Sequence, residues 1–404
     1  MVTEPMSLRA RLLAWGPGLV LGALVGVASG GASALFLWLL GHATSFRERH
    51  EQLVYALPVA GLAIGWVYER FGRSVRAGNN LIIDTMHDGG ADVPRRMGPL
   101  VLLGTVLTHL FGGSAGREGT AVQMGASLAD ALAQRLKVDP GLRRQLLIAG
   151  AAGGFGSVFG TPLAGTAFGL ELGVVAGMEL GGLVPALVAS FVGDFTTRAL
   201  GIQHTPYPPP PAVSLTPVLL VKWAVFAVAI AGATIAFIEL LRFLKGHGER
   251  LVPRLPLRMA LGGLVVVGAW RLVGTSDYLG LGVPTIVRAF TDPTLPSAAF
   301  ALKLLFTAVT LGAGFLGGEV TPLFFVGAAL GNLLARLLGI PLELSVGVGM
   351  AAVFAAASNA PLALSLMAME LLGAAVSPHV AIVCVAAYVL TGKRSIYSAQ
   401  RGLR

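Results

Sequence analysis

The residues most capable of chemistry are a charged pair, Arg117-Glu118, inside the glycine-rich stretch GGSAGREGTAVQMGASLADAL at residues 112–132. Gly116 and Gly119 flank this pair. Glycine leaves backbone amides exposed and allows chain segments to approach closely. A chain break followed by a helix start directs unpaired N–H groups and the positive end of the helix dipole forward, which favours an anion. The pattern predicts an anion site that includes Gly116, Arg117 and Gly119.

The composition around this pair is that of a membrane protein. Of 404 residues, 55% are hydrophobic and 12% are charged, about half the charged fraction of a soluble chain. The mean hydropathy is +0.77. Long apolar runs, which read as membrane spans, occur along the chain, at residues 12–41, 53–68, 264–274 and 379–392. We therefore predict an all-α polytopic membrane protein, with no cleavable signal because the first run is long and others follow it directly.

The net charge of +9 comes from basic residues in short connections between the apolar runs. By the positive-inside rule, many of these connections and both termini are expected in the cytoplasm. No basic face interleaved with aromatic residues is evident, so nucleic-acid binding is not expected. A single cysteine, Cys384, leaves no intrachain disulfide and no cysteine-built metal site.

Glu118 is itself an anion that could occupy the predicted site as a tethered carboxylate. Once protonated, it would leave the site and admit a free anion. An ionisable group at membrane depth is a functional candidate by default, so we predict that Glu118 is a proton-coupled gate. A structural ion pair between Glu118 and Arg117 is the alternative.

An internal repeat organises the chain. The segment at 112–136 aligns with GGEVTPLFFVGAALGNLLARLLG at 317–339, and GTPLAGTAFGLELG at 160–173 aligns with NAPLALSLMAMELLG at 359–373. Both matches are separated by about 200 residues and keep the same order. Glycine- and proline-interrupted apolar segments in corresponding halves are typical of transporters with inverted repeats and a site near the midplane. We predict a first half-repeat at 1–200, a proline-rich linker at 201–215 and an inverted second half-repeat at 216–404.

At this point the sequence resembles a known family. GREGT at 116–120 looks like the GREGP motif of the CLC anion channels and proton-coupled antiporters, and GGEVTP at 317–322 stands where their GxFxP motif does. The resemblance covers nearly the whole chain. It implies a CLC-type inverted-repeat fold with broken and tilted helices, and a homodimer in the lipid bilayer. The paired regulatory domains of many eukaryotic members are not expected, so the resemblance implies a bacterial inner-membrane protein.

Departures from the chloride-transporting members favour one branch. Their GSGIP motif appears here as RAGNN at 76–80, and the phenylalanine of GxFxP is replaced by Val320, which Thr321 follows. Together with Thr120 in place of the GREGP proline, this combination resembles the fluoride-exporting CLC-F branch. Fluoride is small and tightly hydrated, so its site must replace water with compact hydrogen-bond donors.

The resemblance carries further residues into the predicted site. Gly78, Asn79 and Asn80 are candidate anion ligands together with Val320 and Thr321. An ordinary turn or helix cap at the GNN segment is the alternative.

Three more residues carry over from the family. SIYSAQ at 395–400 resembles the inner-gate segment, which makes Tyr397 a candidate anion ligand, with an interfacial tyrosine as the alternative. Leu172 occupies the position of the family's internal proton-relay glutamate. Glu319 is therefore the candidate proton carrier, or otherwise a helix-end acid. For Glu171 and Glu370, which are related by the repeat, we predict a packing role.

Other kinds of site are poorly supported. The seven histidines lack HExxH-like spacing, and His109 is interpreted as a core residue. No GxSxG elbow or P-loop is present, and neither a cofactor nor a bound metal is expected. The favoured prediction is a secondary transporter that exports fluoride in exchange for protons. A chloride/proton antiporter, a passive CLC-type anion channel and an intramembrane enzyme are the alternatives, in that order.

Overall fold

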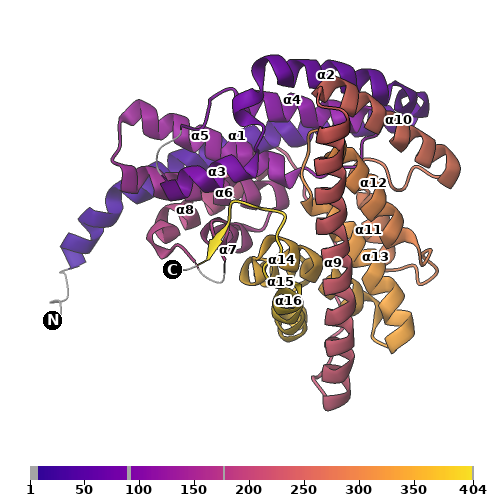
Figure 1. Ribbon diagram of the computed structural model, residues 1–404. Coiled ribbons are helices and arrows are strands. Elements are labelled where there is room, and N and C mark those ends of the chain that lie inside the picture. The colour runs from indigo at the N-terminus through magenta and orange to yellow at the C-terminus, as the bar shows by residue number, and fades with distance from the viewer. Residues whose placement is uncertain (1–7, 89–91, 176–177, 403–404) are drawn as a thin grey trace.

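The computed structural model of the chain describes residues 8–88, 92–175 and 178–402. Within these ranges the fold is helical, as predicted. The first eight helices are α1 (Leu8–Arg49), α2 (Leu57–Phe71), α3 (Asn79–Asp88), α4 (Met97–Leu110), α5 (Glu118–Leu136), α6 (Pro140–Phe159), α7 (Pro162–Glu171) and α8 (Leu183–Ala199). The next eight are α9 (Pro217–Leu251), α10 (Leu255–Val273), α11 (Val283–Ala289), α12 (Ala299–Ala313), α13 (Val320–Leu338), α14 (Leu342–Ser358), α15 (Pro361–Leu372) and α16 (Ser377–Thr391). Figure 1 shows α5, α6 and α8 on the left, α11, α12 and α13 on the right, and α2 beside α10 at the top.

Six helical stretches among the described residues are long and apolar enough to cross a membrane. They are Gly16–Arg49, Leu180–Ala199, Pro217–Leu251, Leu255–Val273, Val320–Leu338 and Ala374–Thr391. Other apolar helices, such as α7 and α15, have only 10 and 12 residues. A helix that short does not span a hydrocarbon core of about 30 Å. Their ends must therefore lie inside the protein, as the glycine and proline interruptions predict.

Local sequence explains where these helices begin and end. At the start of α6, the Oδ1 atom of Asp139 accepts a hydrogen bond of 3.0 Å from Leu142 N, and Pro140 occupies the first helical position, where an N–H has no intrahelical partner. Gly160 ends the helix at φ 76°, a conformation that glycine adopts without strain. Proline also begins α7 and α15. These short signals set the helix breaks that the site requires.

The two repeats join through α7 and α15. The Oε2 atom of Glu171, at the end of α7, accepts a hydrogen bond of 2.8 Å from Ala363 N at the start of α15. The Oε2 atom of Glu370, near the end of α15, accepts one of 2.8 Å from Ala164 N at the start of α7. The preceding amide of each helix donates a second bond, of 3.2 and 2.9 Å respectively. Each carboxylate therefore caps the other repeat's helix, which confirms the predicted packing role of this pair.

We expect Glu171→Ala to lower the melting temperature without changing ion coupling. The substitution leaves two helix N–H groups unpaired in the protein interior, at a cost of about 1–3 kcal/mol. Thermal unfolding in detergent followed by tryptophan fluorescence measures the loss, and Glu343→Ala, at the surface start of α14, is the matched control. An unchanged melting temperature in Glu171→Ala would contradict the capping role.

Close packing of α1 on α8 uses a glycine stripe. A Cβ atom on Gly22 would lie 2.9 Å from Pro185 O, one on Gly26 would lie 2.8 Å from Ala189 O, and one on Gly30 would meet the Gly193 carbonyl. The backbones of the two helices are therefore in direct contact, which is how small residues promote helix association in membranes. These three glycines of the first apolar run therefore serve helix packing.

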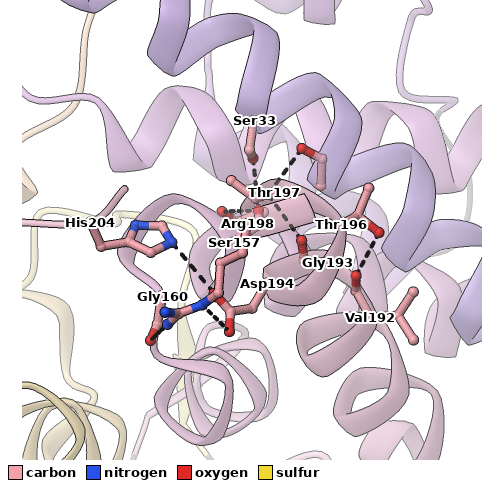
Figure 2. Close-up of polar contacts among 12 residues, drawn as sticks. Ser33, Ser157, Gly160, Val192, Gly193, Asp194, Thr196, Thr197, Arg198 and His204 are labelled. Carbon is pink, nitrogen blue, oxygen red and sulfur yellow. Dashed lines mark hydrogen bonds and ion pairs between the residues drawn. The ribbon is translucent and has the colours of Figure 1, made fainter. Parts of the chain in front are cut away.

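Buried hydroxyl groups complete the same contact (Figure 2). Thr197 Oγ1 donates a hydrogen bond of 3.0 Å to Gly30 O across the two helices. Ser33 and Ser157, on α1 and α6, share a hydrogen bond of 2.7 Å. Just beyond α8, the His204 ring lies 3.4 Å from Asp194, which fixes the start of the segment that leads to α9.

Gly30→Ala should destabilise the protein more than Gly31→Ala. A Cβ atom at Gly30 collides with backbone of α8, whereas nothing lies within 4 Å of one at Gly31. Overpacking costs about 1–3 kcal/mol, while alanine in place of an exposed helical glycine gains up to about 1 kcal/mol. The comparison is made by melting temperature in detergent. Equal melting temperatures for the two variants would show that α1 and α8 are not in close contact.

The C-terminal segment crosses back to the first half. Its strand β2 (Arg401–Gly402) pairs in parallel with β1 (Val174–Val175), next to α7 in Figure 1. Gln400 Nε2 donates hydrogen bonds to Ser358 O and Leu172 O, at 2.8 and 3.2 Å. Arg401 forms an ion pair of 2.6 Å with Asp88, and its hydrogen bonds hold the pKa of that carboxyl below its usual range. The chain end is thus attached to both repeats.

Candidate anion-binding site

The two glycine-rich loops of the repeat meet in a short antiparallel bridge. Gly116 N donates to Gly318 O at 2.6 Å, and Gly318 N donates to Gly116 O at 2.8 Å. A Cβ atom on Gly116 would lie 2.9 Å from Gly318 O and 2.9 Å from Pro322 Cδ, so no larger residue fits there. Because α5 and α13 start directly after these loops, the bridge places the two helix N-termini side by side.

The Glu118 carboxylate lies against the first turn of α13. Thr321 Oγ1 donates to the carboxylate, 2.6 Å from each oxygen, and Thr321 N lies 3.1 Å from Oε2. On its other side, Arg117 N and Arg117 Nε lie 3.2 and 3.3 Å from the carboxylate oxygens. The carboxyl group is fully buried. Hydroxyl, amide and guanidinium donors therefore surround one carboxylate, which is the arrangement that a bound anion requires.

The backbone explains why these donors are available. The first N–H groups of a helix have no carbonyl partner within the helix, and the positive end of the helix dipole lies at the same point. In α13, Pro322 has no N–H, so the Thr321 amide and hydroxyl are the donors that face Glu118. Charge-assisted hydrogen bonds of this kind are about twice as strong as neutral ones.

A third loop reaches the same place from α3. Gly78 adopts φ 57° just before this helix, whose first residue is Asn79. A Cβ atom on Gly119 would lie 3.3 Å from Asn79 Nδ2 and 3.2 Å from Gly318 Cα, so the three loops are in contact. Asn79 Oδ1 is buried and has no hydrogen-bond partner among the described residues. The N-termini of three helices therefore converge near Glu118.

Asn80 binds the C-terminal segment, an interaction that its position in the sequence does not indicate. Its Oδ1 accepts a hydrogen bond of 3.0 Å from Ala399 N, in the C-terminal segment. That bond positions the segment that carries Tyr397, two residues earlier. The side-chain oxygen of Asn80 therefore already accepts a backbone hydrogen bond, and only its side-chain Nδ2 group can donate to an ion.

One side of the site opens into a cavity of about 270 Å³, which we call the Tyr397 cavity. Asn79, Glu319 and Tyr397 line it, and Tyr397 is otherwise buried. Glu319 is the residue immediately before α13 and lies two positions before Thr321, which binds the Glu118 carboxylate. Its carboxyl group faces the cavity that also contains the side chain of Lys245.

Arg117 lines a different cavity of about 560 Å³, which we call the Arg47 cavity. Its walls come from the last turns of α1, the start of α11 and the loop before α11. The Arg117-Glu118 pair therefore lies next to one cavity, while Asn79, Glu319 and Tyr397 line the other.

The comparisons with known proteins agree with this geometry. The family profile described as "Voltage gated chloride channel" matches residues 60–392. The chain belongs to the voltage-gated chloride channel (CLC) family. A relative from Pseudomonas syringae pv. tomato, named "Chloride/fluoride channel protein", is 47% identical over 98% of this chain and 88% of its own length.

Two solved CLC structures have the same architecture. One, titled "Crystal structure of a CLC-type fluoride/proton antiporter", is 35% identical, covers 99% of this chain and 100% of its own, and has a TM-score of 0.93. A slow cyanobacterial Cl⁻/H⁺ antiporter is 20% identical, covers 94% of this chain and 96% of its own, and has a TM-score of 0.83. The predicted CLC-type inverted-repeat fold is confirmed.

Among CLC motif residues of this chain, the structure brings Gly116, Glu118, Gly119 and Thr321 into direct contact, and Val320 is buried beside them. Asn79 reaches Gly119 and also lines the Tyr397 cavity, together with Asn80 and Tyr397. These positions show which residues lie together, and the roles predicted for the individual residues remain proposals.

Sequence reasoning missed the residues that hold the GREGT loop. His109 is buried, as expected for a core histidine, and its ring lies 2.8 Å from Thr105 O and 2.9 Å from Ala115 O. Ser114 N donates a hydrogen bond of 3.1 Å to Thr310 Oγ1 on α12. In the sequence these residues stand out only as polar side chains inside apolar runs, and that feature does not indicate which group each of them binds.

Proposed function

We propose that this chain exports fluoride in exchange for protons, with Glu118 as the proton-coupled gate. The contact between the Glu118 carboxylate and the Thr321 amide and hydroxyl carries the proposal. The 47% identical relative is named for chloride and fluoride, and the 35% identical structure is titled a fluoride/proton antiporter. Both similarities support fluoride/proton exchange.

The gate follows from competition between two anions for one set of donors. The charged Glu118 carboxylate occupies the donors of α13 and excludes a free anion. Protonation removes its charge and weakens its hydrogen bonds to the Thr321 amide and hydroxyl, so the side chain leaves and fluoride enters. Because the proton travels with the side chain, each opening couples anion movement to proton movement.

Compact donors favour fluoride over larger anions. Fluoride loses a tight hydration shell on entering a buried site, and only strong, short hydrogen bonds replace it. The Thr321 hydroxyl already approaches the carboxylate at 2.6 Å, and the Asn79 amide lies beside the same glycines. Val320 stands in place of an aromatic side chain at the first residue of α13 and is buried.

We propose that the Tyr397 cavity opens to the cytoplasm. Arg76, Arg242 and Lys245 line it, and basic residues gather on the cytoplasmic side of membrane proteins. Glu319 in this cavity is then the proton carrier on the inner side, in place of the relay position that Leu172 occupies. The termini are proposed to lie on the same side, although the first seven and last two residues lie outside the described ranges.

The protein is proposed to act as a homodimer in the bacterial inner membrane. Large apolar side chains are exposed along α8 and α16, and they include Leu187, Phe191, Phe195, Val385 and Val389. Lipid or a second copy must cover them. Cross-linking and mass measurement in mild detergent test the dimer, and only monomers would contradict it.

Anion flux in liposomes tests the function. Vesicles that contain the purified protein are loaded with fluoride or with chloride, while internal pH and anion efflux are followed together. We expect a fluoride gradient to drive proton uptake and a chloride gradient to drive much less. Coupled chloride movement would favour a chloride/proton antiporter, and a reversal potential that follows the anion gradient alone would favour a passive channel.

A further inference from the structure

The Arg47 cavity contains a buried cation that the gate does not use. Arg47, in the last turn of α1, is only 6% exposed. Its Nη1 atom has no hydrogen-bond partner in the described part of the chain. Its Nη2 atom lies 3.4 Å from Glu48 Oε1, at the long limit of a hydrogen bond, and the Glu48 side chain is half exposed. A buried guanidinium with free donors is costly unless something occupies them.

A second unpaired donor stands on the same face of the same helix. Thr44 Oγ1 is buried and also has no partner among the residues that the structure describes. Thr44 and Arg47 are three residues apart, a spacing that places both side chains on one face of an α-helix. Both line the Arg47 cavity. A hydroxyl and a guanidinium in one cavity, both with free hydrogen atoms to donate, match an acceptor with negative charge.

A buried lysine holds the wall of the Arg47 cavity from behind. Lys303 is fully buried, and its Nζ donates to Gly280 O at 2.7 Å and Tyr278 O at 3.2 Å. It has no carboxylate within ion-pair distance among the described residues. Asp277, which also lines the cavity, is paired with Arg288 at 3.0 Å. Lys303 therefore fixes the loop that covers Arg47, and the carboxylates of Glu48 and Asp277 also lie on the cavity wall.

The backbone of the cavity wall is shaped around the guanidinium. Gly280 adopts φ 54°, and a Cβ atom there would lie 2.6 Å from Arg47 Nη1. A side chain at this position would displace the guanidinium, so glycine both permits the turn and lets the backbone pack directly against Nη1. The carbonyl of Gly280 is held by Lys303 on the opposite side.

We propose that Arg47 and Thr44 form a second anion subsite, which holds a small, partly hydrated anion in the Arg47 cavity next to the Glu118 gate. The volume of about 560 Å³ accommodates an ion together with several waters. Arg117 lines the same cavity, so the subsite lies on the path that an ion released by Glu118 follows. The subsite rests on the proposed anion transport, but not on which halide is transported.

Calorimetric titration of the full chain in detergent tests the subsite. Sodium fluoride and, in parallel, sodium chloride are the probes, and a large inert anion keeps the ionic strength constant. We expect Arg47→Met to weaken binding roughly tenfold or more, as for the loss of a hydrogen bond to a charged group. Arg49→Met removes an exposed arginine two residues away whose Nε bonds only to Ser45 O, and binding should change less than twofold.

Two further variants keep the test decisive. Thr44→Val preserves the shape of the side chain and removes the free hydroxyl, so it should weaken binding severalfold even if Arg47→Met does not fold. Arg47→Cys can be treated with a thiol reagent that adds an ammonium group, and the native Cys384 is buried. The added ammonium should restore most of the lost affinity, whereas a reagent that adds a sulfonate should not.

The outcomes separate this inference from the proposed function. If Arg47→Met binds each halide with the same affinity as Arg49→Met, the cavity holds water only and the proposed subsite is wrong. The same conclusion follows if the wild type shows no saturable halide binding. If Arg47→Met weakens halide binding while the wild type shows no fluoride-driven proton uptake, the subsite stands and the fluoride/proton exchange fails.

Discussion

Glu118→Gln is expected to abolish the proton uptake that a fluoride gradient drives in liposomes. Glutamine keeps the size of the side chain and resembles the protonated carboxyl group, but it cannot release or bind a proton. It also removes the negative charge that the Thr321 amide and hydroxyl bind at 3.1 and 2.6 Å. Anion flux itself either stops or continues without coupling, and both results agree with the gate. The measurement is a trace of internal pH, with protein incorporation verified.

Glu370→Gln is the matched control for this experiment. Its carboxylate also accepts hydrogen bonds from the first amides of a helix, at 2.9 and 2.8 Å, but it lies where α7 and α15 join. Proton uptake in this variant should remain close to that of the wild type. If Glu118→Gln takes up protons as the wild type does, Glu118 is a structural partner of Arg117 and the coupling residue lies elsewhere.

Thr321→Val should reduce fluoride binding and flux roughly tenfold to a hundredfold. Valine has nearly the shape of threonine, so the change removes one hydroxyl donor at the N-terminus of α13 and little else. A hydrogen bond to a charged group is worth on the order of 1.5–3 kcal/mol, which corresponds to that range in affinity. Fluoride efflux from liposomes at several fluoride concentrations measures the loss.

A buried threonine elsewhere provides the comparison. Thr166 Oγ1 donates to Pro162 O within its own helix at 2.8 Å, so Thr166→Val removes a hydroxyl that faces no ion. Fluoride flux in this variant should stay within about twofold of the wild type. If fluoride flux in Thr321→Val equals that of the wild type, the anion site does not lie at α13. If both threonine variants lose flux equally, the loss reflects a general effect on folding.

The parts of the site that lie within a few residues of one another were predictable from the sequence. A glycine-rich break followed by a helix start is a local signal, and the internal repeat shows that two such breaks exist. The approach of Glu118 to Thr321 could therefore be anticipated from the resemblance. The hydrogen bond from Ala399 N to Asn80 could not, because it joins residues from opposite ends of the chain and neither sequence position indicates the other.

Residues far from a motif were also beyond sequence reasoning. Arg47 was one arginine among many near the end of an apolar run, and positive-inside reasoning assigns such residues to the surface. Its burial depends on the loop at Gly280, which approaches only in the folded protein. Lys303 lies in an apolar helix with no motif around it, and its carbonyl partners come from that same loop.

The C-terminal segment also affects how the protein is made. Translation delivers Glu118 well before Tyr397, and Gln400 and strand β2 hold the segment that carries Tyr397 against the first half. A partly synthesised chain already inserted in the membrane therefore has the gate without the far wall of the Tyr397 cavity. The far wall of the Tyr397 cavity therefore depends on a contact between distant parts of the chain, which cannot form until both halves have been synthesised.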